Sequence, residues 1–271
     1  MASEDYEKQL SFCITSLKRT DQIKITLPKN LEDNRKDSAI IEFVLIDFNR
    51  DDELHNYIME QFEPDLKSGY LKYFHTRELL YWNAAIAKNT SHYYATGRVL
   101  VNLDGDNFTG VGGGLYVLDY FNKNPNMYLH QYSNIYHDGT FGRLAYTRDI
   151  FFKIGGHDES LVTSEDDYII AFFDKLGLAC IRDPNPIYTS AISNPKSETY
   201  VNCDKSIVDS NQMADPQKYD EFRTKMMNKM YARMYENFRR VQSDRSDKLD
   251  IKFGIRQNVY SYQNSQMRKI N

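Results

Sequence analysis

Cysteine, long apolar runs and surplus positive charge are all scarce in this sequence. Its only cysteines are Cys13, Cys180 and Cys203, which are widely spaced and form no CxxC pair. This excludes a zinc knuckle or a disulfide framework as the organising principle and is typical of a reducing compartment. The opening MASEDYEKQL is acidic and lacks the apolar core of a signal peptide, and no segment approaches the roughly 20 apolar residues of a membrane helix. We therefore expect a cytoplasmic protein.

The charge balance excludes another class of protein. A net charge of −4 and an isoelectric point near 5.9 argue against nucleic-acid binding, which normally requires a basic surface. Basic residues do gather late, in FRTKMMNKMYARMYENFRR at residues 222–240, where apolar residues recur at near-helical spacing. This pattern predicts an amphipathic helix with a basic face. Packing on the domain is its simplest role, and contact with an anionic membrane surface or pairing in a homodimer are the alternatives.

The rest of the composition indicates a folded α/β domain. A chain of 271 residues with 41% hydrophobic residues can bury a sizeable core. Apolar runs that suit buried strands alternate with helical patterns along the first hundred residues. The strands are expected at 10–17, 40–48, 71–76 and 99–104, and the helices at 19–31, 51–62 and 77–90. This alternation predicts a Rossmann-like sheet with parallel strands and right-handed crossovers.

The pattern changes after residue 107. We expect helices at 110–121 and 164–177, strands at 127–133 and 178–183, and a strand followed by a short helix within 142–156. Residues 184–216 turn polar and rich in Asn, Ser and Pro, which predicts a long surface loop of the kind that is often functional. The final residues, 261–271, are expected to fray.

Polar side chains follow the predicted strands at the edge where ligands bind in open α/β sheets. Thr15 and Ser16 close the first strand, and Asp47 and Asn49 follow the second. The fourth strand ends in the acidic stretch VNLDGDN, residues 101–107. We therefore expect a ligand at this edge.

Three interpretations of the DGDN stretch compete. An EF-hand loop starting at Asp104 is excluded, because its fifth, sixth and twelfth positions hold Phe108, Thr109 and Leu115. A dinucleotide fingerprint is equally poor, since GVGGGL lacks the last glycine of GxGxxG and does not follow its strand directly. A plain acidic turn stays open for an isolated DxD. Hard oxygen ligands at a strand end otherwise suit Mg²⁺ or Mn²⁺ bridging to substrate phosphates.

A second acidic motif, SEDDY at residues 164–168, begins a predicted helix. Taken alone it is explained by Ser164 as the helix N-cap with acidic residues in the first turn, where the helix dipole favours them. Its carboxylates could also remove a proton from a substrate. No convincing Ser/His/Asp or Cys/His arrangement offers a covalent nucleophile instead.

Taken together, the motifs resemble a known family. The series ITSLKR, FVLIDFNRDDEL, YWNAAIA, GRVLVNLDGDN and GRLAYTRDIFFKIGGHDESL…SEDDYII is similar, in order and spacing, to inverting, metal-dependent glycosyltransferases of the GT-A fold. The likeness is greatest to galactosyltransferase-like and chondroitin-polymerase-like domains, and it covers roughly residues 9–180. It implies a catalytic core at 1–183, with a nucleotide-binding half at about 9–107 and an acceptor half at about 108–183. Residues 184–271 would add the polar loop and a C-terminal helical extension.

The resemblance also implies roles for individual residues. Asp106 would bind Mn²⁺ or Mg²⁺ directly, and Asp104 would contact the ribose or reach the metal through water. Asp166 would be the general base, with Glu165 beside it orienting the acceptor hydroxyl. The remaining candidates would bind the nucleotide-sugar donor, and they are Thr15, Ser16, Arg19, Asp47, Asn49, Asn83 and Gly105.

The sequence departs from the family at one metal ligand. Galactosyltransferase-like relatives use a histidine downstream of the ED motif, whereas all six histidines here precede it. Water, the diphosphate, or Asp204 or Asp209 in the polar loop could complete the metal shell. His157 is expected to occupy an ordinary turn position rather than to bind sugar, and Trp82 to pack in the core from within the helix at 77–90.

The expected function is transfer of one sugar, with inversion, from a nucleotide donor such as a UDP-sugar to a carbohydrate or glycoconjugate acceptor. A nucleotidyltransferase is the enzyme rival, although ITSLKRTDQ lacks the glycine of its usual loop. A catalytically silent sugar-binding or scaffold protein with the same fold is the rival of another class.

Overall fold

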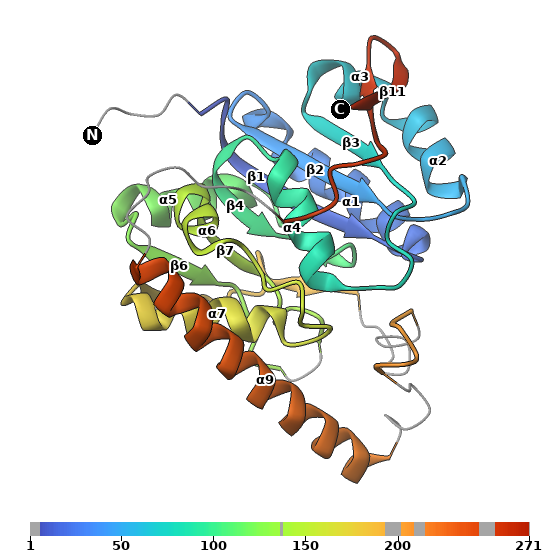
Figure 1. Ribbon diagram of the computed structural model, residues 1–271. Helices are drawn as coiled ribbons and strands as arrows, with labels where there is room; N and C mark the ends of the chain where they lie inside the picture. Colours follow the sequence, from blue (N-terminus) through green and yellow to red (C-terminus); the bar gives the residue numbers. More distant parts are fainter. Residues whose placement is uncertain (1–5, 136–137, 193–201, 209–214, 244–252, 271) are drawn as a thin grey trace.

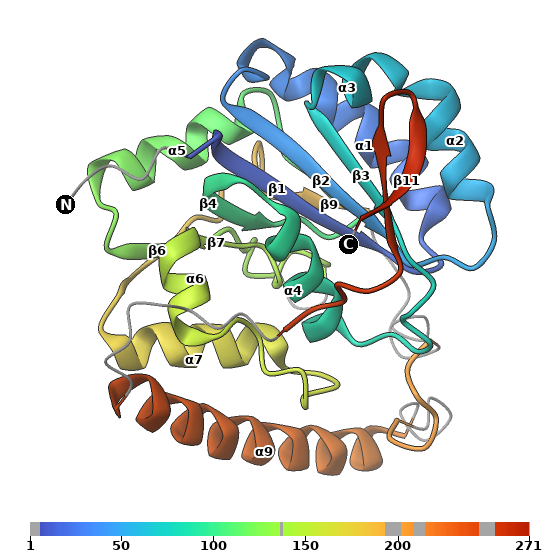
Figure 2. The same ribbon diagram turned by 45° about the horizontal axis from the view of Figure 1, so that its top comes forward.

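The computed structural model describes residues 6–135, 138–192, 202–208, 215–243 and 253–270. A large mixed sheet crosses the molecule, with helices on both faces (Figures 1 and 2). Its strands are β1 (Lys8–Ser16), β2 (Ile41–Asp47), β3 (Leu71–His75), β4 (Gly97–Asn102), β6 (Met127–His130), β7 (Leu144–Thr147), β8 (Ala179–Arg182), β10 (Val259–Gln263) and β11 (Gln266–Ile270). The nine strands lie in the order β11-β10-β3-β2-β1-β4-β7-β6-β8.

Two apolar cores hold the helices against the sheet, one on each face. One face carries α1 (Thr20–Asn34), α2 (Glu53–Gln61), α3 (Glu63–Ser68) and α5 (Gly113–Lys123). The other carries α4 (Ala84–Tyr94), α6 (Arg148–Ile154) and α7 (Glu165–Leu176). Successive side chains of a strand point to opposite faces, so Phe12 and Ile14 of β1 join the first core and Cys13 joins the second. Burial on both faces explains why the central strands are continuously apolar.

The first four strands are parallel, as the sequence predicts. β1 pairs in parallel with β2 on one side and with β4 on the other, from Cys13↔Asn102 back to Lys8↔Gly97. The chain therefore winds outward from β1 to β3 and then returns across β1 to β4. The gap between β1 and β4 is the point at which strand order reverses, where ligands bind beyond the carboxyl ends of the strands. The DGDN stretch begins two residues after the last residue of β4, Asn102.

The second half makes the sheet mixed, because β7 runs antiparallel to β4 and β6. A separate two-stranded ribbon forms beside the DGDN stretch, from β5 (Asn107–Phe108) and β9 (Ser190–Ala191). The polar segment after residue 184 thus returns to the edge where the carboxylates lie. Residues 193–201 and 209–214 of the predicted loop lie outside the described residues, and the division of the chain at residue 183 stays a prediction.

The long helix α9 (Pro216–Ser243) packs along α7 on the outside of the second core (Figure 2). Met226, Met230 and Met234 recur every four residues on its buried side. Arg233 Nε donates to Oδ2 of Asp158 at 2.7 Å, which adds a charged contact at the rim. These contacts agree with the role of packing on the domain. Membrane contact and homodimer formation stay predictions, and none of the described helices is long and apolar enough to cross a membrane.

The expectation of a frayed C-terminus is wrong. β10 and β11 form an antiparallel hairpin, and β10 pairs with the edge strand β3 through Tyr260↔His75 and Ser261↔Phe74. The two turn residues, Asn264 and Ser265, have φ of 49° and 63°. Positive φ at both positions is the geometry that a two-residue hairpin turn requires, and asparagine tolerates it well. This hairpin covers the β3 edge, which would otherwise expose unpaired backbone groups.

The helix expected at 77–90 begins later than predicted, at Ala84. Asn83 is its N-cap, because its side chain accepts a hydrogen bond from Ile86 N at 3.1 Å. The preceding residues are drawn into a loop by tertiary contacts, since Trp82 N donates to the carbonyl of Asn202 at 2.7 Å. Trp82 therefore lies before the helix rather than in it, although it does pack against the second core as expected.

Candidate active site

Helix α1 fixes the DGDN stretch at the end of β4. Thr26 Oγ1 donates to the carbonyl of Gly105 at 2.7 Å, and Asn30 Nδ2 donates to the carbonyl of Asn107 at 2.9 Å. From the other side, Ile192 N donates to the carbonyl of Asp106 at 2.8 Å. Because backbone groups are held at three successive residues, the two aspartate side chains start from a defined position.

A buried lysine joins the two acidic motifs. Lys88 of α4 places Nζ 2.7 Å from Oδ1 and 2.8 Å from Oδ2 of Asp166. The same Nζ lies 3.0 Å from Oε1 of Glu165. The side chain of Lys88 is 6% exposed and that of Asp166 12%, so this ion pair is largely shielded from water. Lys88 thereby fixes the direction of both carboxylates at the start of α7.

Gly142 leaves the space in which the acidic motifs meet. A Cβ built on this glycine would lie 2.7 Å from Oδ2 of Asp166, 3.0 Å from Oδ2 of Asp104 and 3.3 Å from Lys88 Nζ. The carboxylates of Asp104 and Asp166, from motifs about sixty residues apart in the chain, therefore converge on one point. Any larger residue at position 142 would occupy that point.

Charge and burial shift the pKa values in this cluster. Burial raises the pKa of Asp166 well above its ordinary value, the charges of Glu165 and Asp104 add to the rise, and Lys88 opposes it. Burial alone would lower the pKa of Lys88, but the charges of Asp166, Glu165 and Asp104 outweigh it and keep the pKa well above normal. Lys88 therefore stays protonated, and Asp166 is the group in this pair that can accept a proton.

A buried hydrogen-bond chain supports Asp166 from below. Asn102 Nδ2 lies 3.4 Å from Oδ1 of Asp166, and Tyr146 Oη donates to Oδ1 of Asn102 at 3.1 Å. Tyr146 Oη is also 2.9 Å from Nε2 of His92. Burial keeps the pKa of His92 well below its ordinary value, so the imidazole is neutral. This series of hydrogen bonds runs from α7 through the sheet to α4.

The start of α7 differs in one respect from the simple capping interpretation. Ser164 occupies the N-cap position, but its side chain makes no capping hydrogen bond, and its φ of 65° lies in the left-handed region. This conformation costs a non-glycine residue on the order of 1 kcal/mol. His157 supports the same turn, with Nδ1 3.1 Å from the carbonyl of Glu165, so it occupies a turn position as expected.

Three of the predicted donor-binding residues come together at the ends of β1 and β2. Asn49 N donates to Oδ1 of Asp47 at 2.8 Å, and Asn49 Nδ2 lies 3.5 Å from Ser16 Oγ. Tyr73 Oη occupies the other oxygen of Asp47 at 2.8 Å. Asp47 has no exposed surface. It therefore holds the loop that carries Asn49 from beneath, instead of lining an open pocket itself.

A cavity of about 530 Å³ opens beside these residues. Its walls come from the segments that follow β1 and β2, from the loop before α4 and from residues 202–206. The residues with side chains suited to a nucleotide are Lys18, Asn49, Arg50, Tyr81 and Lys205. The size falls within the range of small-molecule pockets. Three cations outnumber the two carboxylates of the lining, Asp51 and Asp204, and together with an exposed aromatic ring they are a suitable lining for a phosphorylated nucleoside.

The remaining candidates separate into two groups. Arg19 precedes α1, and its charge lowers the pKa of Asp106, which places the guanidinium near the DGDN stretch. The backbone oxygen of Thr15 lies 3.6 Å from the point where a Cβ on Gly105 would sit, so both belong to the same edge. Asn83 does not join them. Its amide caps α4 and donates to the carbonyl of Glu159 at 3.2 Å, which makes it a structural link.

The DGDN carboxylates fit a hard divalent cation. Burial and the charge of Asp104 raise the pKa of Asp106 to about 6. The ionised carboxylates of Asp104 and Asp106 therefore repel each other, and a bound cation would reduce this repulsion. Within the described part of the chain, no three His, Cys, Asp or Glu side chains gather into a complete metal site. Mg²⁺ or Mn²⁺ often takes only one or two protein carboxylates and completes its shell with water and phosphate oxygens. Asp204 lines the 530 Å³ cavity, and Asp209 lies outside the described residues.

No protein-family model matches the sequence, and no curated protein matches it. Solved structures do. The mannosyltransferase PcManGT from Pyrobaculum calidifontis, in complex with GDP-Man and Mn²⁺, superposes with a TM-score of 0.60 at 12% identity, over 88% of this chain and 71% of its own. S. aureus TarS 1-349 with UDP-GlcNAc gives a TM-score of 0.56 at 14% identity, over 71% and 62%. The chain has the GT-A fold.

A third GT-A structure, GalNAc-T7 with UDP, GalNAc and Mn²⁺, gives a TM-score of 0.52 at 17% identity and covers 67% of this chain. The chain spans 62% of the TarS fragment and 43% of GalNAc-T7. These similarities confirm the predicted fold class, a Rossmann-like mixed sheet flanked by helices.

Three residues of this candidate site were not predicted from the sequence. Lys88 was one lysine within a predicted helix, Gly142 one of 13 glycines, and Arg143 part of a motif with no assigned role. Arg143 is 1% exposed and donates through Nη1 to the carbonyl of Phe108. Burial lowers its pKa to about 10, so it remains charged close to Asp104 and Asp183. Of the three, only Lys88 could have been found from the sequence, because a lysine on the inward face of a helix normally requires a buried acidic partner.

Replacing Lys88 with methionine is expected to destabilise the protein by about 3 kcal/mol at pH 7, because it leaves buried carboxylates without their cation. The loss should shrink at pH 4, since Asp166, whose folded pKa is raised, then takes up a proton and no longer needs a partner. Urea unfolding at both pH values measures this. Lys123→Met is the matched control, because Lys123 pairs with Asp119 at the surface, where such a pair contributes about 0–1 kcal/mol. Equal losses for the two variants would contradict the assignment.

Proposed function

We propose that the protein is a metal-dependent inverting glycosyltransferase that moves one sugar from a nucleotide-sugar, most simply a UDP-sugar, to a carbohydrate acceptor. The observation that carries this proposal is the convergence of Asp104 and Asp166 on the space beside Gly142. It lies at the carboxyl edge of a GT-A sheet, near a cavity in which three cations outnumber two carboxylates. The solved GT-A neighbours were crystallised with GDP-Man or UDP-GlcNAc, and the mannosyltransferase also with Mn²⁺, which supports the donor class and the metal.

Asp166 is the general base in this proposal. The acceptor hydroxyl forms a bond to the anomeric carbon while the bond from that carbon to the diphosphate breaks, and the hydroxyl proton passes to a carboxylate oxygen of Asp166. A raised pKa makes this carboxylate a better proton acceptor at neutral pH. Lys88 holds the carboxylate in place without competing for the proton, because it stays charged. Glu165, which shares Lys88, orients the acceptor hydroxyl.

The leaving diphosphate acquires negative charge as the sugar departs. Lys18, Arg50 and Lys205 line the adjacent cavity and would offset part of that charge. Asp106 would hold the divalent cation, with Asp104 contacting it directly or through water, and when bound this cation supplies further electrostatic stabilisation of the diphosphate. Asn49 and Tyr81, which line the same cavity, would bind the nucleoside. Attack from the face opposite the diphosphate gives inversion.

A donor panel tests the activity. UDP-, GDP- and CMP-sugars with Mn²⁺ should include one donor that the protein hydrolyses slowly, releasing nucleotide, and faster when an acceptor oligosaccharide is added. The anomeric configuration of the product, read by NMR, should be opposite to that of the donor. Release of pyrophosphate from a nucleoside triphosphate and a sugar phosphate would instead identify the nucleotidyltransferase. Binding without any turnover across the panel would identify the silent sugar-binding protein.

Mn²⁺ binding is expected to depend on pH through Asp106. Its pKa of about 6 in the metal-free protein means that Mn²⁺ displaces a proton below pH 6 but not above pH 7. The affinity should therefore be constant above about pH 7 and fall about tenfold per pH unit below pH 6. Electron paramagnetic resonance of free Mn²⁺ measures this without nucleotide, whose own phosphates titrate nearby. A flat profile from pH 5 to pH 7 would show that Asp106 does not bind the ion.

A further inference from the structure

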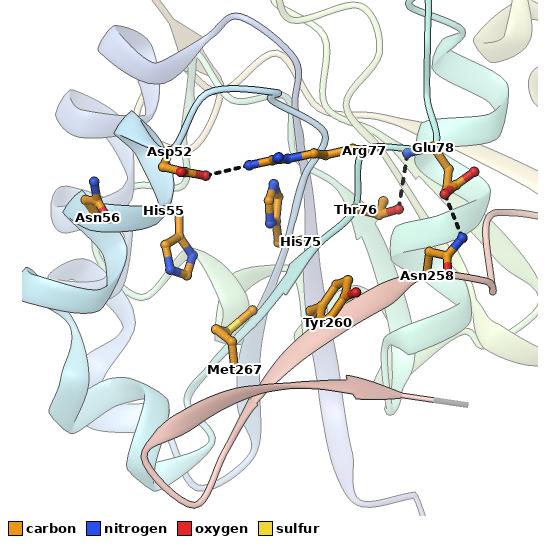
Figure 3. A pocket seen from close by; sticks show the side chains of 10 residues that line it. All are labelled: Asp52, His55, Asn56, His75, Thr76, Arg77, Glu78, Asn258, Tyr260 and Met267. Carbon is orange, nitrogen blue, oxygen red and sulfur yellow. Dashed lines mark hydrogen bonds and ion pairs between the residues drawn. The ribbon is translucent and has the colours of Figure 1, made fainter.

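A second cavity, of about 700 Å³, lies next to the 530 Å³ cavity, because Asp52 in its wall directly follows Asp51 in the wall of the first (Figure 3). Its walls are α2, the residues that follow β3 and the C-terminal hairpin. His55 from α2, His75 from β3, and Tyr260 and Met267 from the hairpin point toward the same space. The C-terminal hairpin forms one of these walls, and the same hairpin pairs with the edge strand β3.

This cavity is separate from the carboxylate site. The strand order places β3 two strands away from β1 and three from β4. Neighbouring strands are about 4.8 Å apart, which puts the end of β3 roughly 14 Å from the DGDN stretch. None of the proposed catalytic or metal-binding residues lines the cavity. A ligand here would bind beside the donor site without touching the reacting atoms.

The charged groups of the wall leave little attraction for an anion. Arg77 Nη2 is 2.8 Å from Oδ1 of Asp52, so the cation is already paired. Glu78 Oε1 accepts from Asn258 Nδ2 at 2.8 Å. Two carboxylates therefore face one guanidinium. Burial and the charge of His75 lower the pKa of His55, which keeps that imidazole neutral. A phosphate or a carboxylate ligand would meet net negative charge.

The rest of the lining combines ring faces with planar polar groups. Tyr260 is 41% exposed, and the rings of His55 and His75 lie 5.9 Å apart, centroid to centroid. The aromatic rings and the methionine side chain offer apolar surface, and the tyrosine and histidine rings also carry polar atoms. Around them, carboxylate, guanidinium and amide groups present donors and acceptors side by side. A pyranose ring matches this pattern, because it has an apolar C–H face and pairs of neighbouring hydroxyls at its edge.

A neighbouring cavity extends the surface. It measures about 650 Å³ and shares Glu78 with the first. Tyr93 and Tyr94 line it, and the guanidinium of Arg256 lies 5.6 Å from the ring centroid of Tyr93. Two cavities that meet at one side chain and both carry tyrosines form a surface long enough for several sugar units.

We propose that these two cavities, joined at Glu78, form a second carbohydrate-binding site for a neutral oligosaccharide, separate from the site of sugar transfer. Such a site would keep the protein on a glycan while the donor is exchanged. The proposal does not depend on transferase activity, since it concerns binding alone.

Titration calorimetry and saturation-transfer NMR test the site, with maltotetraose, cellotetraose, xylotetraose and chitotetraose as probes. At least one is expected to bind, with the same affinity in the presence and absence of UDP and Mn²⁺. Tyr260→Ala should weaken binding at least about tenfold through loss of the ring face, and Tyr260→Phe should keep it within about twofold. Tyr231→Ala is the matched control, because Tyr231 on α9 is 46% exposed and lies in neither cavity.

Several outcomes would overturn the proposal. One is that none of the four tetrasaccharides binds, and another is that Tyr260→Ala, shown by its melting temperature to be folded, binds as well as Tyr231→Ala. If UDP competes with the sugar, or if Tyr260→Ala loses affinity for UDP, the cavities belong to the donor site instead. Failure of the donor panel while a tetrasaccharide still binds would remove the proposed transferase activity and leave this site standing.

Discussion

Asp166→Asn is expected to lower the rate of sugar transfer by about 10²- to 10⁴-fold, the range that a positioned general base contributes. Asparagine fills the same space between Lys88 and Asn102 but cannot accept the acceptor's proton. Donor and Mn²⁺ affinity should change little, because the proposed donor and metal groups lie on other elements. Initial rates with the donor identified by the panel, together with calorimetry of UDP binding, separate the two effects.

Asp167→Asn is the control for this substitution. Asp167 occupies the next position of the same helix turn, and burial likewise raises its pKa, but it makes no contact with Lys88 among the hydrogen bonds and ion pairs of that lysine. Its transfer rate should stay within about threefold of the wild type, as for a substitution away from the reacting atoms. If Asp166→Asn kept more than a tenth of the wild-type rate, Asp166 would not be the base.

Asp106→Asn is expected to abolish metal-supported transfer and to weaken Mn²⁺ binding at least about 100-fold, since loss of a mere partner of a metal ligand already costs roughly 10- to 100-fold. The same substitution is expected to stabilise the protein when no metal is bound. The folded pKa of Asp106 is about 6, against 3.8 for an ordinary aspartate. Ionised Asp106 therefore penalises the folded state above about pH 6, and this penalty is absent below about pH 4. The metal-free variant should be more stable than the wild type at pH 7, by up to about 3 kcal/mol.

Melting curves with and without Mn²⁺ display both effects of Asp106→Asn. The wild type should gain stability from the ion, and the variant should start higher but gain nothing. Asp119→Asn controls for the loss of an acidic group, because Asp119 lies at the surface of α5 and pairs with Lys123. A variant that is less stable without metal, yet still stabilised by Mn²⁺, would place the ion elsewhere.

Much of the structure of residues 9–107 could be predicted from the sequence. The strands β1 to β4 and their parallel order follow from continuous apolar runs separated by helical patterns, and these are local signals. The positions of Ser16, Asn49 and Asp104 at strand ends follow from the same boundaries. The roles of Asp106 and Asp166 come only from the family resemblance, and they stay proposals that the substitutions above test.

Errors arose where a tertiary contact overrode a local pattern. The stretch at 77–83 continues the helical pattern of the residues after it, yet Trp82 N bonds to Asn202 and Asn83 caps the helix that follows. The C-terminal residues look polar and unstructured, but the β3 edge supplies backbone partners for them. Asn264–Ser265 was a readable hairpin-turn signal that the polar composition masked.

The sequence by itself determined which residues lie at the carboxyl edge of the sheet, because apolar periodicity fixes where each strand ends. Only the tertiary structure decided how the two acidic motifs meet. Lys88 and Asp166 are 78 residues apart, and Gly142 matters because of the atoms that surround an absent side chain. The second cavity likewise depends on a hairpin that joins a strand nearly two hundred residues earlier. Such contacts are set by packing between distant segments, for which no local sequence pattern exists.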